Sequence, residues 1–321
     1  MHYDVFNGDA DGIIALVQLR LNDPKDSHLV TGVKRDIELL KRVDINEASS
    51  VTVLDISMEK NKDSLLSILD RNIPVFYADH HRSGDIPESS NLEAIIDLDA
   101  NTCTCLIINK YLSEKYAHWA IAAAYGDNMI KAAEALADKH NVSEPDREGL
   151  RQLGIYVNYN GYGATLEDLH FPPAELFRYL VKFEDPLTLI ADKESVYWAL
   201  KSAYEQDMKK AQAAQDIENS ETCRVIALPD QAWARRVSGV VGNSLANESP
   251  DKAHAVLTEN IDGSYRVSLR APLNNKRGAD EICVKFDTGG GRAGAAGINY
   301  LPANQLQCFI REVNEFYGQK V

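Results

Sequence analysis

Short apolar runs alternate with amphipathic segments in the first third of the chain. Residues 3–6, 50–54 and 73–78 are rich in β-branched and aromatic residues and have the length of buried strands. Residues 13–21 and 60–71, which lie between them, carry leucine and isoleucine at the spacing of a helix face. Strands that alternate with helices predict an α/β fold with a doubly wound parallel sheet.

Acidic residues and imidazoles follow each of these predicted strands. The first strand leads to Asp9 and Asp11, the second to Asp55, and the third to Asp79-His80-His81. Aspartate is also common in ordinary turns, so each motif alone is a weak signal. The carboxyl ends of parallel strands meet at one edge of a sheet, where we expect these side chains to converge. Carboxylates and imidazoles at one edge predict a manganese or magnesium site.

Later segments extend this picture. Residues 93–96 are predicted to form a fourth strand, followed by a helix that reaches residue 111. An apolar, alanine-rich helix at 118–124 leads to Asp127, which is either a last metal ligand or part of a helix-ending turn. Residues 158–163 are predicted to form a loop. In it Tyr159 or Tyr162 either stacks on a nucleobase or packs within the loop itself.

The second half of the chain alternates again after a charged, alanine-rich segment at 201–220 that is typical of a solvated helix. The chain has 321 residues, enough for about two domains. We predict a metal-binding domain at residues 1–195, a helical linker at 196–221, and a smaller α/β domain with a mixed sheet at 222–321. The elements expected in this last domain are a strand at 223–228, a helix at 235–245, a hairpin of 253–259 and 265–271, and a short helix at 280–286.

A glycine-rich segment in the second half is a candidate anion site. Gly289, Gly290 and Gly291 are followed by Arg292 and small residues. As a loop, such a segment either wraps an anion with backbone N–H groups or is merely flexible. Arg270 and Arg292 could add bidentate contacts to a phosphate, which favours substrate binding.

Charge and cysteine content restrict the class of protein. The chain carries 34 Lys and Arg against 48 Asp and Glu, a net charge of −14, which opposes binding of long nucleic acid. A small phosphorylated substrate or a short oligonucleotide is compatible with this charge. The 5 cysteines show no Cys-x-x-Cys pair, and neither a signal peptide nor a membrane-spanning apolar run is apparent. We therefore expect a cytoplasmic protein without a membrane partner, and the sequence is compatible with a homodimer.

Together, these motifs resemble the DHH phosphoesterase superfamily with its DHH-associated C-terminal domain. They occur in the family's order and cover nearly the whole chain: Asp9-Ala10-Asp11-Gly12, Asp55, Asp79-His80-His81, Gly126-Asp127, Ser268-Leu269-Arg270 and Gly289-Gly290-Gly291-Arg292 with Ala295-Ala296-Gly297. The family includes manganese-dependent nanoRNases, nucleotide phosphatases, cyclic-dinucleotide phosphodiesterases, polyphosphatases and RecJ-like exonucleases.

The resemblance implies a role for each matching residue. His81 would lie near the scissile phosphate, with Asp79 supporting the histidines. In the second domain Arg270 and the glycine segment would hold the far end of the substrate, and Asn7 and Arg292 are further substrate-binding candidates. One or two Mn²⁺ (or Mg²⁺) ions would be bound by Asp9, Asp11, Asp55, His80 and Asp127.

Two positions depart from the family pattern. Val5 stands where many members carry a histidine ligand, so the first metal position lacks one donor unless Asn7 replaces it. Arg292 stands where the family usually has histidine, which could favour an extra phosphate. The resemblance implies a metal-dependent phosphoesterase acting on short oligonucleotides or nucleotide phosphates. The alternatives are a RecJ-like 5′→3′ single-strand exonuclease and a non-catalytic nucleotide sensor.

Overall fold

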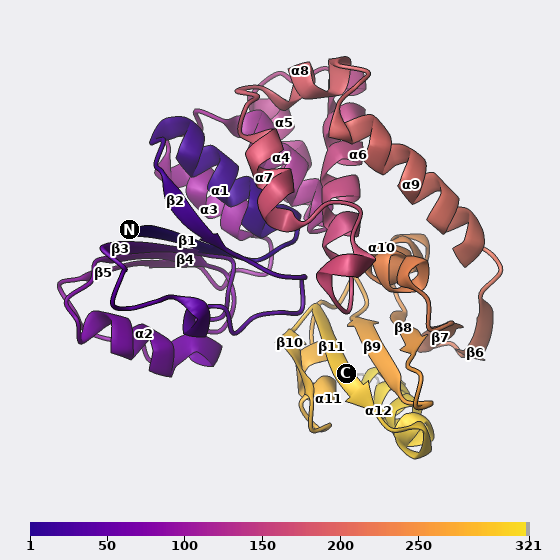
Figure 1. The fold of residues 1–321 in the computed structure, drawn as a ribbon. Helices are drawn as coiled ribbons and strands as arrows, with labels where there is room; N and C mark the ends of the chain where they lie inside the picture. Colours follow the sequence, from indigo (N-terminus) through magenta and orange to yellow (C-terminus); the bar gives the residue numbers. More distant parts are fainter. Residues whose placement is uncertain (319–321) are drawn as a thin grey trace. The chain divides into compact units, whose positions relative to one another are not determined.

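The computed structural model describes residues 1–318, which form two compact units, with the second beginning at Tyr204. The first unit is built on a parallel sheet, which confirms the predicted fold class (Figure 1). Its strands lie in the order β2-β1-β3-β4-β5. The strand order therefore reverses between β1 and β3, which is the topological switch point of the sheet. Their bounds are β1 (His2–Phe6), β2 (Ser27–Val30), β3 (Ser50–Leu54), β4 (Val75–Asp79) and β5 (Leu92–Ile96).

Helices cover both faces of this sheet. On one face, Val5, Val53 and Tyr77 pack against Leu65 and Ile68 of α2 (Lys62–Leu69). The opposite face is covered by the larger group of helices that includes α1 (Ala10–Asn22) (Figure 1). The other helices of this unit are α3 (Thr104–Tyr111), α4 (Ala117–Gly126), α5 (Ile130–Lys139), α6 (Glu144–Gly161), α7 (Pro173–Leu180) and α8 (Pro186–Ala191), with short turns at η1 (Leu40–Arg42), η2 (Glu59–Asn61) and η3 (Leu166–Asp168).

Two segments of this unit differ from the sequence prediction. The predicted loop at 158–163 is wrong, because its first residues form the last turn of α6. Tyr159 is fully buried there, and its hydroxyl lies 2.8 Å from Nε2 of His170. The strand β2 was not predicted, since Ser27–Val30 is short and half polar. It forms the sheet edge next to β1.

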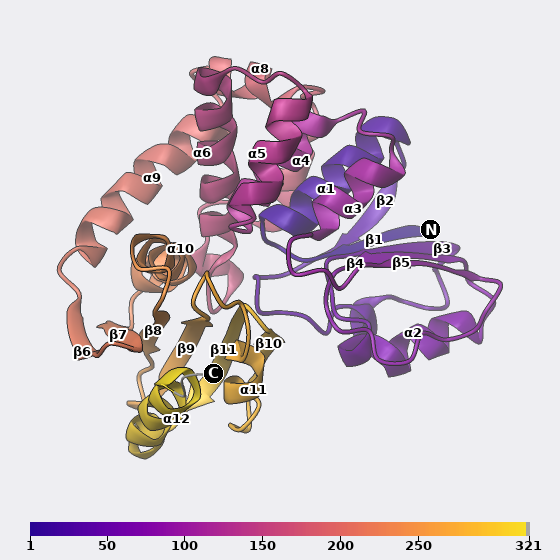
Figure 2. The same ribbon diagram turned by 180° about the vertical axis from the view of Figure 1, so that it is seen from behind.

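The second unit contains a mixed sheet in the order β10-β11-β9-β8-β7-β6, as predicted for a smaller α/β domain. Side chains alternate between its faces. Val256 faces Gly242 of α10 (Ala232–Glu248), whereas Val225 and Leu257 belong to the core that includes Phe309 of α12 (Leu306–Gly318). Figure 2 gives the reverse view of these helices. The remaining elements are β6 (Gln215–Asn219), β7 (Cys223–Leu228), β8 (Ala253–Glu259), β9 (Tyr265–Arg270), α11 (Ala279–Cys283), β10 (Gly289–Arg292), β11 (Ala295–Leu301) and η4 (Ala303–Gln305).

The segment that joins the units is only partly helical. The helix α9 (Val196–Ala211) ends before the predicted limit, and residues 215–219 are not helical but form β6, paired antiparallel with β7. In residues 1–318 no helix is both long and apolar enough to span a membrane.

Candidate metal centre

Polar side chains from separate strand ends converge at one edge of the parallel sheet. Asp9 caps the N-terminus of α1 directly after β1, Asp55 follows β3, and Asp79 ends β4. Because these strands run parallel, their carboxyl ends lie at the same edge. Asp9, Asp55 and Asp79 are each at most 2% exposed, so their charges require compensation within the protein.

The N-terminus of α3 holds the carboxylate of Asp11. The backbone N–H groups of Thr104 and Cys105 donate to its two oxygens at 2.7 and 2.8 Å. The start of a helix is favourable for a negative charge, because its first N–H groups have no partner within the helix. These contacts fix the orientation of Asp11 at the edge of the sheet.

Asp55 occupies a strained position beside it. Its φ angle of 58° lies in the left-handed region, where a non-glycine residue is uncommon. Thr104 donates its hydroxyl hydrogen to Oδ1 of Asp55 at 3.1 Å. Burial, reinforced by the negative charges of Asp11 and Asp9, raises the pKa of Asp55 well above its usual value. A cation bound here would relieve that repulsion.

The imidazole of His80 is oriented by a backbone carbonyl. Its Nδ1 lies 2.8 Å from the carbonyl oxygen of Thr102, which can only accept, so Nδ1 carries the hydrogen. Nε2 lies 3.4 Å from Oδ1 of Asp55 and 3.7 Å from Oδ2 of Asp11. In the neutral ring this nitrogen is a lone-pair donor facing two carboxylates. That arrangement suits a metal ion between them, with a carbonyl fixing the tautomer of the ligand.

His81 has a different partner. Its Nδ1 lies 2.6 Å from Oδ1 of Asp79, so the carboxylate accepts from this nitrogen and Nε2 is directed away from Asp79. Burial disfavours ionisation of Asp79, but the charge and hydrogen bond of His81 together with the contacts of His80 outweigh burial and keep the pKa of Asp79 below its usual value. The side chain of His81 is 28% exposed, whereas that of His80 is 3% exposed. His81 is therefore accessible to a solute while His80 is enclosed.

Lys34 is the residue of this site that the sequence prediction missed. Its ammonium pairs with Oδ2 of Asp9, lies 3.9 Å from Oδ1 of Asp127, and donates to Oδ1 of Asn158 at 3.2 Å. Burial raises the pKa of Asp9, but the charge and hydrogen bond of Lys34, together with the N–H of Gly12, outweigh it, and the pKa lies below its usual value. Lys34 follows β2 closely. Recognition of that strand in the sequence would have placed this lysine at the same edge.

Asn7 has a role in the scaffold. Its Oδ1 accepts from the backbone N–H of Asp9 at 3.2 Å, and its Nδ2 donates to the carbonyl oxygen of Lys34 at 3.1 Å. The side chain links the end of β1 to the segment after β2, and its residue is 4% exposed. Its predicted role in substrate binding stays a prediction.

The donor chemistry at this edge fits a divalent metal ion. Two sets of three side chains bring a ligand atom each to within 4.8 Å of one another: Asp55 with His80 and His81, and Asp11 with His80 and Asp127. Oxygen and imidazole nitrogen together are the donors that Mn²⁺ accepts in proteins. The predicted ligands Asp11, Asp55, His80 and Asp127 are thus brought together. Asp9 is linked to Asp127 by the ammonium of Lys34, which lies close to both carboxylates.

No protein-family model matches the sequence, and no curated protein matches it significantly. Solved structures do match. A DHH domain described as a member of the s1p family of ribosomal proteins is similar at a TM-score of 0.64 and 12% identity, covering 99% of this chain and 86% of its own. An exonuclease RecJ bound to manganese is similar at a TM-score of 0.54 and 16% identity, covering 100% of this chain and 90% of its own. The chain has the fold of the DHH-domain proteins.

A third structure extends this likeness within the DHH fold. It is a pGpG-specific phosphodiesterase, PggH, from Vibrio cholerae, with a TM-score of 0.52 and 11% identity over 99% of each chain. At identities this low the likeness establishes the fold.

The predicted substrate-binding residues of the second unit are anchored locally. Nε of Arg270 donates to Oδ1 of Asn243 at 2.6 Å, and its Nη1 donates to Oγ of Ser268 at 3.0 Å. The predicted glycine loop is wrong in conformation, since Gly289–Arg292 is the strand β10, paired antiparallel with β11. A Cβ at Gly289 would lie 1.7 Å from the carbonyl oxygen of Cys283, so glycine permits this strand to pack against α11. Substrate binding by these residues stays a prediction.

Proposed function

We propose that the chain is a divalent-metal-dependent phosphoesterase that hydrolyses short oligonucleotides or nucleotide phosphates. The observation that carries this proposal is the position of His80. A carbonyl fixes its tautomer, and Nε2 faces Asp11 and Asp55 at the carboxyl edge of the sheet. Buried carboxylates around a neutral imidazole need a cation, and this set supplies the oxygen and nitrogen ligands of Mn²⁺ or Mg²⁺.

The chain's own residues divide the work of hydrolysis. A bound ion would polarise the phosphoryl oxygens and lower the pKa of a water molecule. Asp11 and Asp55 would hold the ion in a defined place. The N-terminus of α3 fixes the carboxylate of Asp11, and the strained turn after β3 fixes that of Asp55. When its ring is protonated, His81, aligned by Asp79, presents Nε2–H as a donor to the charge that develops on the phosphate or on the leaving oxygen. Its partial exposure admits the substrate.

Two observations bear on the size of the substrate. The net charge of −14 opposes association with a long polyanion and favours a short one. The similar PggH is described as a pGpG-specific phosphodiesterase, which supports a dinucleotide-sized substrate. The similarity to an exonuclease RecJ supports the second candidate, a single-strand 5′→3′ exonuclease.

A substrate panel with Mn²⁺ tests the proposal. We expect release of nucleotide or phosphate from a dinucleotide, a cyclic dinucleotide or adenosine 3′,5′-bisphosphate, with little cleavage of a long single strand. Asp55→Asn should lower the rate by more than the roughly 10–100-fold typical for loss of a partner outside the first ligand shell. Asp97→Asn is the matched control, because this exposed acid follows β5 at the same edge but belongs to neither donor set.

Each result of the panel leads to a definite conclusion. Digestion of the long strand at a rate comparable to the dinucleotide would support the exonuclease instead. An absence of turnover on every substrate while Mn²⁺ is bound would reject hydrolysis and favour a nucleotide sensor. Equal activity of Asp55→Asn and wild type would exclude the proposed metal centre.

A further inference from the structure

Lys34 provides a fixed positive charge at one end of the acidic cluster. Its ammonium pairs with Asp9, lies 3.9 Å from Oδ1 of Asp127 and donates to Asn158 at 3.2 Å. The ring of Tyr162 lies 5.2 Å from the same nitrogen, at the distance of a cation–π contact. Three oxygen atoms and an aromatic face thus surround one cationic group.

The backbone around Lys34 is held on both sides. Its N–H donates to the carbonyl oxygen of Gly161 at 2.8 Å, and its carbonyl oxygen accepts from Asn7 at 3.1 Å. Gly161 ends α6, and a Cβ there would lie 2.8 Å from the carbonyl oxygen of Gly8, so the end of the helix lies directly on the turn after β1. The side chain of Lys34 is only 22% exposed. Its ammonium is therefore part of the site and not a mobile surface charge.

The two sets of donor side chains define a single metal position. Both sets contain His80, and Nδ1 of His80 contacts the carbonyl oxygen of Thr102, so only Nε2 can bind a metal. One nitrogen lone pair serves one ion, and the two sets therefore describe alternative ligands of the same position. Within residues 1–318 Asp9 belongs to neither set.

We propose that this protein uses one divalent ion, and that the ammonium of Lys34 permanently replaces a second one at Asp9 and Asp127. The proposal rests on the phosphoesterase function proposed above and specifies its metal content. Two-metal phosphoesterases place their ions about 3.5–4 Å apart, so that both stabilise charge on the transferred group. Lys34 brings a positive charge to the same edge without a metal, and Asp9 positions that charge.

The experiment measures Mn²⁺ content, which is independent of turnover. Metal-free full-length protein is titrated with Mn²⁺ by calorimetry, and the loaded protein is examined by electron paramagnetic resonance. Wild type should bind one equivalent with the resolved hyperfine spectrum of an isolated ion. Lys34→Ala should bind a second equivalent at Asp9 and Asp127 and show a spectrum broadened by coupling between two ions. Lys34→Arg should again bind one, because it restores the charge.

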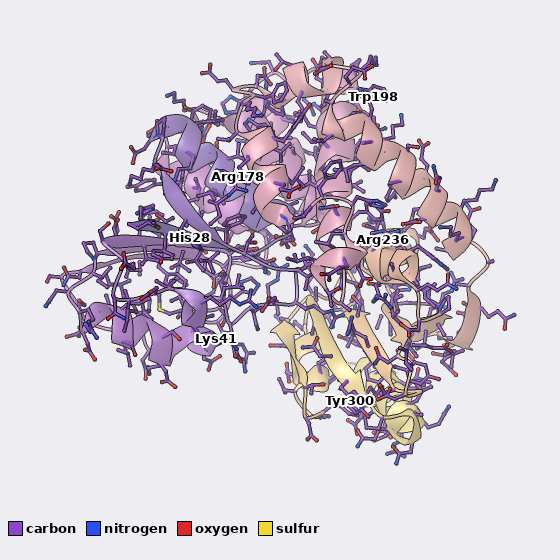
Figure 3. All side chains as sticks on the ribbon, viewed as in Figure 1. His28, Lys41, Arg178, Trp198, Arg236 and Tyr300 are labelled. Atoms are coloured by element: carbon purple, nitrogen blue, oxygen red, sulfur yellow. The ribbon has the colours of Figure 1, made fainter. Side chains whose placement is uncertain are left out.

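The matched control is Lys41→Ala. Lys41 is a labelled surface residue in Figure 3, is 57% exposed and pairs only with Glu38 among the ion pairs of residues 1–318. Its removal should leave the stoichiometry at one. Asp9→Asn supplies a second variant should Lys34→Ala not fold. If Asp9 pairs with Lys34 and does not bind the metal, the Kd for Mn²⁺ should change by less than about tenfold in this variant. Loss of a ligand, or of a residue that hydrogen-bonds to a ligand, should change it by roughly tenfold or more.

The outcomes separate this inference from the function on which it rests. Two equivalents in wild type with hydrolysis of the short substrates would overturn the role of Lys34 and retain the phosphoesterase. One equivalent in Lys34→Ala, or at least about tenfold weaker binding in Asp9→Asn, would also overturn it. No Mn²⁺ binding and no hydrolysis in wild type would refute the phosphoesterase itself.

Discussion

The crossing of α4 and α6 allows a quantitative test of how the site is supported. A Cβ at Gly154 of α6 would lie 1.8 Å from the carbonyl oxygen of Ala122 in α4. A Cβ at Gly126, the last residue of α4, would lie 2.6 Å from the carbonyl oxygen of Gly154. Asp127 follows immediately. The two glycines therefore set the depth at which Asp127 reaches the sheet edge.

We predict that Gly154→Ala destabilises the protein. Restoring an ordinary contact requires the helices to separate by roughly 1.5 Å, and overpacking of this kind costs about 1–3 kcal/mol or more. The higher helix propensity of alanine offsets about 1 kcal/mol. Because the clashing atom is backbone, we expect a net loss of about 2 kcal/mol. For a unit of this size that lowers Tm by about 4–8 °C.

Thermal unfolding of the metal-free protein measures this effect, and Gly149→Ala is its control. Gly149 lies on the same helix, but its added Cβ would meet only the end of the Ile190 side chain at 3.4 Å. This variant should gain up to about 1 kcal/mol from helix propensity. Gly154→Ala should also weaken Mn²⁺ binding by about tenfold, because Asp127 moves. A Gly154→Ala protein that melts at or above wild type would refute the close helix packing.

Three further predictions concern the carboxylates. Burial opposes ionisation of Asp4, but Arg20, with hydrogen bonds from His2 and Ser27, outweighs it and lowers the pKa of Asp4 from 3.8 to about 2. The stabilisation is therefore present above pH 3.8 and is lost as pH falls towards 2. In urea unfolding, the free energy of unfolding of wild type should therefore decrease as pH falls towards 2. In Asp4→Asn this decrease should be smaller by about 2 kcal/mol. Asp79→Asn should lower kcat by about 10–100-fold through misorientation of His81 while leaving the Mn²⁺ stoichiometry unchanged; an unchanged kcat would argue against the pairing. Asp55→Asn should raise the Tm of the metal-free protein at pH 8, because the raised pKa of Asp55 makes its ionised form costly. Calorimetry should show this gain shrinking as pH falls through that pKa, and a lower Tm at pH 8 would contradict the prediction.

The strand ends of the metal centre could be predicted because local pattern determines them. Apolar β-rich runs before Asp9, Asp55 and Asp79 specify buried parallel strands, and parallel strands share an edge. Lys34 could not be found in the same way. It follows a short, half-polar strand, and its partner Asn158 comes from a helix end far away in the sequence. Only the packing of α6 on the turn after β1 brings them together.

The glycine segment illustrates a second limit. Gly289 to Gly291 have no side chains that favour loop or strand, so local preference leaves the choice open. The pairing partner β11 and the carbonyl of Cys283 decide it, and both are tertiary contacts. The helical composition of 201–220 similarly did not reveal β6, whose strand state depends on pairing with β7.

The most direct test of the metal centre is the nitrogen coupling to bound Mn²⁺ in pulsed electron paramagnetic resonance. The structure places Nε2 of His80 among the carboxylates and commits Nδ1 of His81 to Asp79. Wild type and His81→Gln should therefore both show coupling to an imidazole nitrogen, and His80→Gln should lack it. Coupling that persists in His80→Gln, or disappears in His81→Gln, would contradict this assignment.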